Sequence, residues 1–228
     1  LYRSSERFQA LGEALTVLGS MLFGSGIWLI AQIYHINEHF PTAFLVWGLG
    51  AAALAWAMPS VAQGVLAAAL LAAWGASEAI GFDYSQWLAP LLLAAVLGPL
   101  AWRPRSRVLT GVLIPGLAVA AVSSVGAAQE ELVIPLLLAY AAILTGGGYF
   151  LRLHGRFAEE APVLLAYGLG SYFVVSYPLT FPDLAEELID HHSVGTGLAP
   201  AVLAVTLALL FIWAPWSWAL QRWRTGRP

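Results

Sequence analysis

The stretch Arg103-Pro104-Arg105-Ser106-Arg107 lies between two apolar runs, one ending at Trp102 and the next beginning at Val108. A proline among three cations suits a loop in water, whereas the flanking runs suit the interior of a membrane. All 10 basic residues of the chain are arginines, and each group is separated from the next by an even number of apolar runs. They are Arg3, Arg7, Arg103, Arg105, Arg107, Arg152, Arg156, Arg222, Arg224 and Arg227. This register predicts a polytopic membrane protein with every arginine on one side.

The composition supports this reading. Hydrophobic residues make up 60% of the chain and charged residues 10%, whereas soluble domains carry about 25% charged residues. We expect membrane lipids as the surroundings. No basic stripe is large enough to neutralise many phosphates, so nucleic acid is excluded as a partner. The absence of cysteine excludes disulfides and thiolate metal sites.

A spanning helix needs about 20 mostly apolar residues. We expect spans over residues 11–36, 42–58, 61–82, 85–102, 108–128, 132–151, 162–179 and 198–220. The predicted fold is therefore an all-α transmembrane bundle of about eight spans, forming a single domain over residues 1–228. An even number of spans places both termini on the arginine side, which the positive-inside rule makes cytoplasmic. Residues 180–197 form the one long outer connection, in which we expect a short amphipathic helix that ends at Gly195.

The two halves of the chain, residues 1–105 and 106–228, resemble each other weakly. Leu15-Thr16-Val17-Leu18 opens the first span, and Leu109-Thr110-Gly111-Val112 opens the fifth. Four spans in each half would give two parallel four-helix repeats, as in some transporter folds. Chance similarity between apolar segments explains the same observation, and both readings stay open.

Small residues mark the first span. Its glycines and serines would let neighbouring helices approach closely, so we expect this span to be central in the bundle. These glycines and serines are Gly12, Gly19, Ser20, Gly24, Ser25 and Gly26. Glu13, near the start of the span, is expected to be interfacial. Gln32 is expected to hydrogen-bond to a neighbouring helix.

Polar residues near the outer ends of the first and third spans suggest a pocket, because polar groups in hydrocarbon are costly. We predict an outward-facing ligand pocket that draws on Gln32, Tyr34, His35, Glu78 and Asp83. Histidines at the outer side offer weak candidates for a metal site: His35, His39, His191 and His192. An interfacial or hydrogen-bonding role is favoured for them, and neither a metal nor another cofactor is predicted.

Residues 18–36 read Leu-Gly-Ser-Met-Leu-Phe-Gly-Ser-Gly-Ile-Trp-Leu-Ile-Ala-Gln-Ile-Tyr-His-Ile, and residues 44–50 read Phe-Leu-Val-Trp-Gly-Leu-Gly. These stretches, in about the first quarter of the chain, resemble the family called domain of unknown function 2157. The resemblance implies a bacterial inner-membrane protein without an assigned activity, and it supplies no catalytic residues. It marks Gln32, Tyr34, His35 and Trp47 as patterned positions.

We therefore expect binding or transport of a small solute or lipid through the outward-facing pocket. One alternative is a non-catalytic subunit that packs against other membrane proteins. Another is an intramembrane metal-dependent hydrolase, although an enzyme is the less favoured class and its catalytic residues would be unknown.

Overall fold

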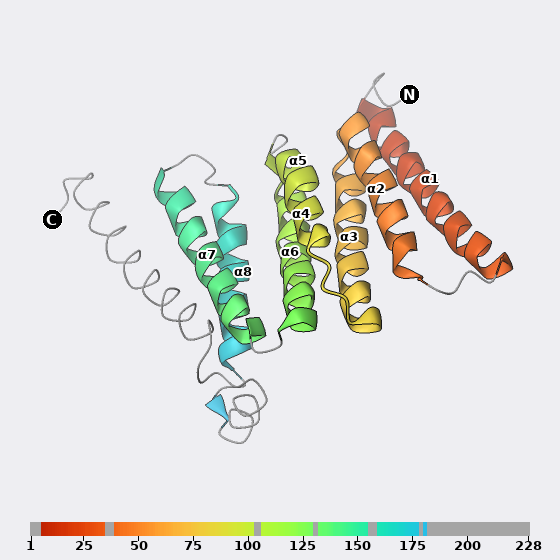
Figure 1. Ribbon diagram of the computed structural model, residues 1–228. Coiled ribbons are helices and arrows are strands. Elements are labelled where there is room, and N and C mark those ends of the chain that lie inside the picture. Colours follow the sequence, from red (N-terminus) through yellow and green to blue (C-terminus); the bar gives the residue numbers. More distant parts are fainter. Residues whose placement is uncertain are drawn as a thin grey trace. The chain divides into compact units, whose positions relative to one another are not determined.

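The computed structural model of the chain describes residues 6–34, 39–102, 106–129, 132–154, 159–177 and 180–181 (Figure 1). All regular elements in these ranges are helices, which confirms the all-α class. They are α1 (Glu6–Ile33), α2 (Pro41–Ala57), α3 (Val61–Phe82), α4 (Leu88–Leu92), the π-helix η1 (Leu93–Leu97), α5 (Gly98–Trp102), α6 (Arg107–Ala128), α7 (Val133–His154) and α8 (Ala161–Ser176).

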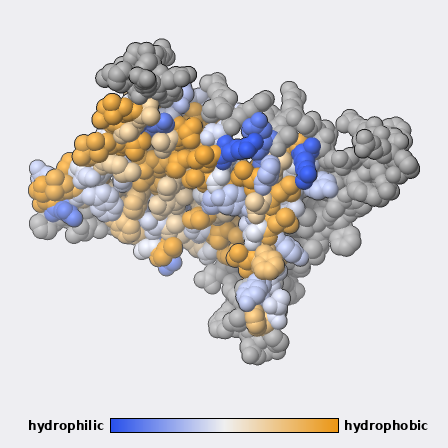
Figure 2. All heavy atoms as spheres, turned by 180° about the vertical axis from the view of Figure 1, so that it is seen from behind, coloured by the Kyte–Doolittle hydropathy of each residue, from blue (hydrophilic) through white to orange (hydrophobic). Residues whose placement is uncertain are grey.

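Among the described residues, four helices are long and apolar enough to cross a membrane. These candidate spans are Ala10–Ile33, Val61–Phe82, Arg107–Ala128 and Val133–Arg152, and three shorter apolar helices accompany them. Figure 2 shows broad apolar areas on the face that it presents. The predicted eighth span, residues 198–220, and almost all of the predicted outer helix lie outside the described residues. The number of eight spans therefore stays a prediction.

Local sequence signals explain several helix boundaries. The Ser60 side chain accepts a hydrogen bond from the Gln63 backbone N–H and caps α3. Pro41 begins α2, where its missing N–H costs nothing. Asp83 ends α3 in the left-handed region at φ 50°, a conformation that Asp tolerates better than most residues.

The predicted fourth span is a continuous helix that contains a π-helical turn. α4, η1 and α5 follow one another without a break, and η1 widens the helix just before Pro99. A proline removes one hydrogen bond, and its ring clashes with the carbonyl four residues earlier, which accounts for the wider turn there. The Trp56 indole Nε1–H of α2 donates to the Val96 carbonyl oxygen at 3.0 Å. Residues 88–102 give a helix about 22 Å long, shorter than the roughly 30 Å hydrocarbon core.

The chain divides into two compact units, Leu1–Ser124 and Val125–Pro228. The division falls inside α6 and not between residues 105 and 106, so it gives no support to the proposed halves. The repeat stays a prediction.

In unit 1, α3 is the central helix. Small residues at its contacts, on α3 itself or on the neighbouring helix, let three neighbours approach it. A Cβ added at Gly75 would lie 2.7 Å from Ala89 of α4, and one added at Gly64 would lie 3.1 Å from Leu109 of α6. On the α2 side, a Cβ added at Gly48 would lie 3.1 Å from Leu71.

The first span, which we expect to be central in the bundle, is not the central helix of unit 1. α1 packs against α2 and α3 and lies at the edge of unit 1 (Figure 1). Leu22 and Ile33 on its outer face are 65% and 61% exposed. Only part of the small-residue surface makes a close contact: a Cβ at Gly24 would overlap the Trp47 indole, whereas one at Gly19 or Gly26 would meet nothing. Small residues permit close packing of helices, but close packing occurs only where a neighbouring helix lies against them.

In unit 2, α7 and α8 form a closely packed pair. A Cβ added at Gly148 of α7 would lie 2.9 Å from Leu165 of α8, and one added at Gly168 of α8 would overlap Thr145 of α7. Glycines on both helices therefore set their separation, as is common between transmembrane helices.

Candidate functional site

A buried carboxylate lies near the C-terminal end of α3. Glu78 is only 4% exposed, and its Oε1 accepts hydrogen bonds from the Trp74 Nε1–H at 2.9 Å and from His39 Nε2 at 2.9 Å. Burying a carboxylate costs free energy unless polar partners surround it. These two N–H groups meet that need at one of the oxygen atoms.

Local structure brings the three residues together. Trp74 and Glu78 are four residues apart on α3, so they share one face of the helix. His39 lies in the turn that leads into α2. Its ring lies 4.5 Å from the ring of Phe82, between centroids, and its side chain is 47% exposed. The half-exposed imidazole thus connects the buried carboxylate to the surface.

The second carboxylate oxygen, Oε2, makes no hydrogen bond with the described residues. A carboxylate has about four lone-pair positions, and two are used here at Oε1. The site can therefore accept another hydrogen bond or hold a cation. The Phe82 ring that packs on His39 also contacts Phe40, with the centroids of the two phenylalanine rings 5.7 Å apart.

Four of the five predicted pocket residues, all except His35, lie in the described part of the chain. Glu78 is buried. The imidazole that contacts its carboxylate belongs to His39 and not to the predicted His35. Gln32 and Tyr34 are exposed at the end of α1, and the described contacts do not join them to Glu78. Asp83 is exposed and caps α3 through its backbone. His35, His191 and His192 lie outside the described residues, so the pocket as first predicted stays a prediction.

The described residues contain no group of three or more His, Cys, Asp or Glu side chains that could hold a metal ion. At the Glu78 site the pair of Glu78 and His39 could supply two ligands, whereas structural zinc sites use four.

A second polar cluster lies at the opposite end of α3. Glu13 Oε1 accepts from the Ser60 hydroxyl at 2.7 Å and from the Ala62 backbone N–H at 3.4 Å. Glu13 thus places its carboxylate at the N-terminus of α3, where a negative charge is favourable. Farther along, the Ser20 hydroxyl donates to Gln63 Oε1 at 3.0 Å. Gln63 is fully buried, and its Nε2 has no hydrogen-bond partner.

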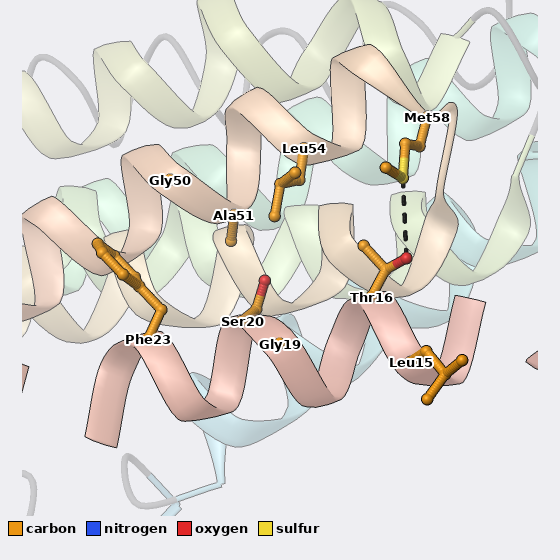
Figure 3. Close-up of a pocket in the computed structure, with 9 residues that line it drawn as sticks. All are labelled: Leu15, Thr16, Gly19, Ser20, Phe23, Gly50, Ala51, Leu54 and Met58. Carbon is orange, nitrogen blue, oxygen red and sulfur yellow. Dashed lines mark hydrogen bonds between the residues drawn. The ribbon is translucent and has the colours of Figure 1, made fainter. Parts of the chain in front are cut away.

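Beside this cluster, α1 and α2 enclose a groove of about 550 Å³ (Figure 3). Its lining is mostly apolar, and the hydroxyl groups of Thr16 and Ser20 are the polar exceptions. Figure 3 shows the Thr16 hydroxyl directed at the sulfur of Met58, at 3.7 Å.

Residues 1–64 match the sequence model of one protein family. Its description is "Predicted membrane protein (DUF2157)". The match agrees with the resemblance of the first quarter of the chain and with the apolar helices. No curated protein and no solved structure matches the chain.

The region that matches the DUF2157 family contains α1, α2 and the first turn of α3, and hence the groove and Gln63. It includes His39 but ends before Trp74 and Glu78. Sequence reasoning missed the Ser60–Gln63 cluster, although Ser60-Val61-Ala62-Gln63 is a capping-box pattern that marks a helix start. Here the glutamine side chain contacts Ser20 of another helix, which the pattern alone does not reveal.

Proposed function

We propose that this chain is an integral protein of the bacterial inner membrane that binds a small solute at Glu78 from the outer side. The solute would carry a hydrogen-bond donor or a positive charge. The observation that supports this most is the buried Glu78 carboxylate, which holds two N–H donors on Oε1 and leaves Oε2 without a partner among the described residues. Ionisable groups inside membrane segments commonly mark ligand or ion sites.

The outward orientation follows from the arginine pattern. In unit 1, α1 and α6 begin at the same end, with Arg107 at the start of α6 (Figure 1). His39 and Glu78 belong to the other end, where α2 begins and α3 ends. If the arginine end is cytoplasmic, the exposed edge of His39 faces the outside. Transport would require a further step after binding, and solute uptake into vesicles would test it.

A screen by thermal unfolding of the purified chain in detergent tests the proposal. Small amines and quaternary ammonium ions are compared with neutral molecules of the same shape. A ligand at 100 times its Kd stabilises the folded state by about 2.7 kcal/mol, so binding should raise Tm measurably. We expect at least one cationic or donor-bearing compound to raise Tm.

Glu78→Gln should abolish that rise, because it removes the charge with little change of shape. Glu159→Gln is the control, since it removes a carboxylate on an exposed residue of unit 2. If the two variants respond to the compound alike, Glu78 is not the binding residue.

A second candidate function is that of a subunit in a membrane complex. The small residues Gly19 and Gly26 are seven positions apart on one face of α1, and a Cβ added at either would meet no atom within 4 Å. Small residues left unpacked favour a helix partner. Photo-crosslinking from a benzophenone side chain introduced at position 26 in native membranes would detect such a partner, and the absence of any crosslinked species would argue against it.

A further inference from the structure

The His39 imidazole occupies the water-facing side of the Glu78 carboxylate. Its Nε2 lies 2.9 Å from Glu78 Oε1, and the His39 side chain is 47% exposed. The carboxylate's other partner, Trp74, is only 3% exposed, and Glu78 itself is 4% exposed. A solute that reaches this carboxylate from water therefore takes the place of the imidazole.

The imidazole can leave while the helices stay intact. His39 lies in the turn before α2, and its ring contacts Glu78 and Phe82. A rotation of its side chain breaks no backbone hydrogen bond. Glu78 and Phe82 are four residues apart on α3 and share one face of the helix. The space that the ring leaves is thus bordered by a carboxylate and an aromatic ring, which still contacts Phe40.

These two borders define the solute that fits. A planar cation with N–H groups can donate to the carboxylate, as a guanidinium does with two parallel hydrogen bonds. It can also lie against the Phe82 ring, because cation–π attraction acts within about 6 Å of a ring centroid. The imidazole ring, whose centroid lies 4.5 Å from that of Phe82, is itself a planar N–H donor of this size.

The charge on His39 then affects binding. An imidazolium is attracted to Glu78 more strongly than a neutral imidazole, and it repels a cationic solute. The other titratable groups nearby in sequence are Glu78 on α3, with Asp83 and Tyr84 after its last residue, while Pro41–Ala57 of α2 carries none. Acidification neutralises carboxylates, so His39 is the group among these that gains a positive charge.

We propose that the solute of the Glu78 site is a small planar cation that displaces the His39 imidazole, so that solute and protons compete for this carboxylate. The assignment rests on the function proposed above. Acidification weakens solute binding, because it charges the imidazole that occupies the site. Conversely, binding of the solute releases protons from the fraction of chains in which His39 is charged.

Isothermal titration calorimetry of the full chain in detergent tests the proposal. Methylguanidinium is the solute, because a guanidinium stays charged throughout the pH range used, and methylurea is its neutral analogue. From about pH 8 to pH 6, where histidine side chains ordinarily titrate, we expect the Kd of methylguanidinium to rise by up to about tenfold per pH unit. Buffers with different ionisation enthalpies should show net proton release, and methylurea should show no binding.

Substitutions of His39 isolate the imidazole. His39→Gln keeps a neutral donor and His39→Ala removes the side chain, and both should bind methylguanidinium with a Kd that no longer depends on pH. His39→Ala should also bind it more tightly than the unmodified chain does at pH 6, because the competitor is gone. His35→Gln is the control, since it makes the same substitution at the histidine first predicted to pair with Glu78, and it should keep the pH dependence.

A pH dependence that persists in His39→Gln would place the proton on another group and overturn the proposal. Binding by the unmodified chain that does not change with pH would also overturn it. Methylguanidinium that binds neither the unmodified chain nor His39→Ala would exclude the planar cation. A different cation whose binding is abolished by Glu78→Gln would then leave the solute site standing, whereas failure of every cation in the thermal screen would remove the solute site as well.

Discussion

At the scale of single residues, the buried charge of Glu78 depends on its N–H donors. A hydrogen bond to a charged group contributes about 1.5–3 kcal/mol, against about 0.5–1.5 kcal/mol for a neutral acceptor. The chain contains one hydrogen bond of each kind, and in both the donor is a tryptophan indole N–H. The Trp74 indole donates to the Glu78 carboxylate, and the Trp56 indole donates to the Val96 carbonyl.

Trp74→Phe should therefore lower the free energy of unfolding by about 1.5–3 kcal/mol, and Trp56→Phe by about 0.5–1.5 kcal/mol. Denaturant titration in detergent measures both. In a Glu78→Gln background the cost of Trp74→Phe should fall to that of Trp56→Phe, since the acceptor is then neutral. A cost that does not change in this background would mean that Trp74 acts through packing alone.

Sequence reasoning found Glu78 at this scale, because a carboxylate inside an apolar run stands out. It paired Glu78 with His35 and Asp83. The observed partner is His39, since the turn before Pro41 places that imidazole against α3. Side-chain pairing between helices depends on how the helices pack, and spacing along one helix carries no such information. The same reason explains why the contact of Ser20 with Gln63 was not predicted.

At the scale of elements, helix boundaries could be predicted well and helix neighbours could not. The predicted third span, residues 61–82, coincides with α3, because a serine cap and a continuous apolar run define it. The small residues of α1 suggested a central helix, yet α3 holds that position through Gly64, Gly75 and the alanines between them. Both helices carry small residues, so their number does not distinguish the central helix from the edge helix.

Gly24→Ala should lower the free energy of unfolding by about 1–3 kcal/mol, because the new methyl group would overlap the Trp47 indole. Gly26→Ala, two residues farther along α1, should be neutral or slightly stabilising, since it meets open space. Thermal unfolding of both variants in the same detergent compares them. Equal effects would mean that α1 does not pack on α2 through Gly24.

At the scale of the whole molecule, the arginine register predicts which loops face the cytoplasm. The described helices are consistent with this register within unit 1, where Tyr84 and Ser106 lie at opposite ends of the helices (Figure 1). The division of the chain inside α6 had no counterpart in the sequence, because a continuous apolar helix gives no signal there.

Single cysteines in the naturally cysteine-free chain test this orientation. Tyr84→Cys, at a residue that is 58% exposed, should react with a membrane-impermeant thiol reagent in intact cells. Ser106→Cys should react only after the cells are permeabilised. The reverse pattern would place the Glu78 site on the cytoplasmic side.

The solute site itself is tested most directly by the indole N–H NMR signal of Trp74, assigned by its loss in Trp74→Phe. This N–H donates to Glu78 Oε1 at 2.9 Å, so a solute bound at the carboxylate must change its surroundings. During titration with a compound that raises Tm, we predict that the Trp74 signal shifts, that the Trp56 signal stays in place, and that Glu78→Gln abolishes the shift. A compound that stabilises the protein while the Trp74 signal stays unmoved would contradict binding at Glu78.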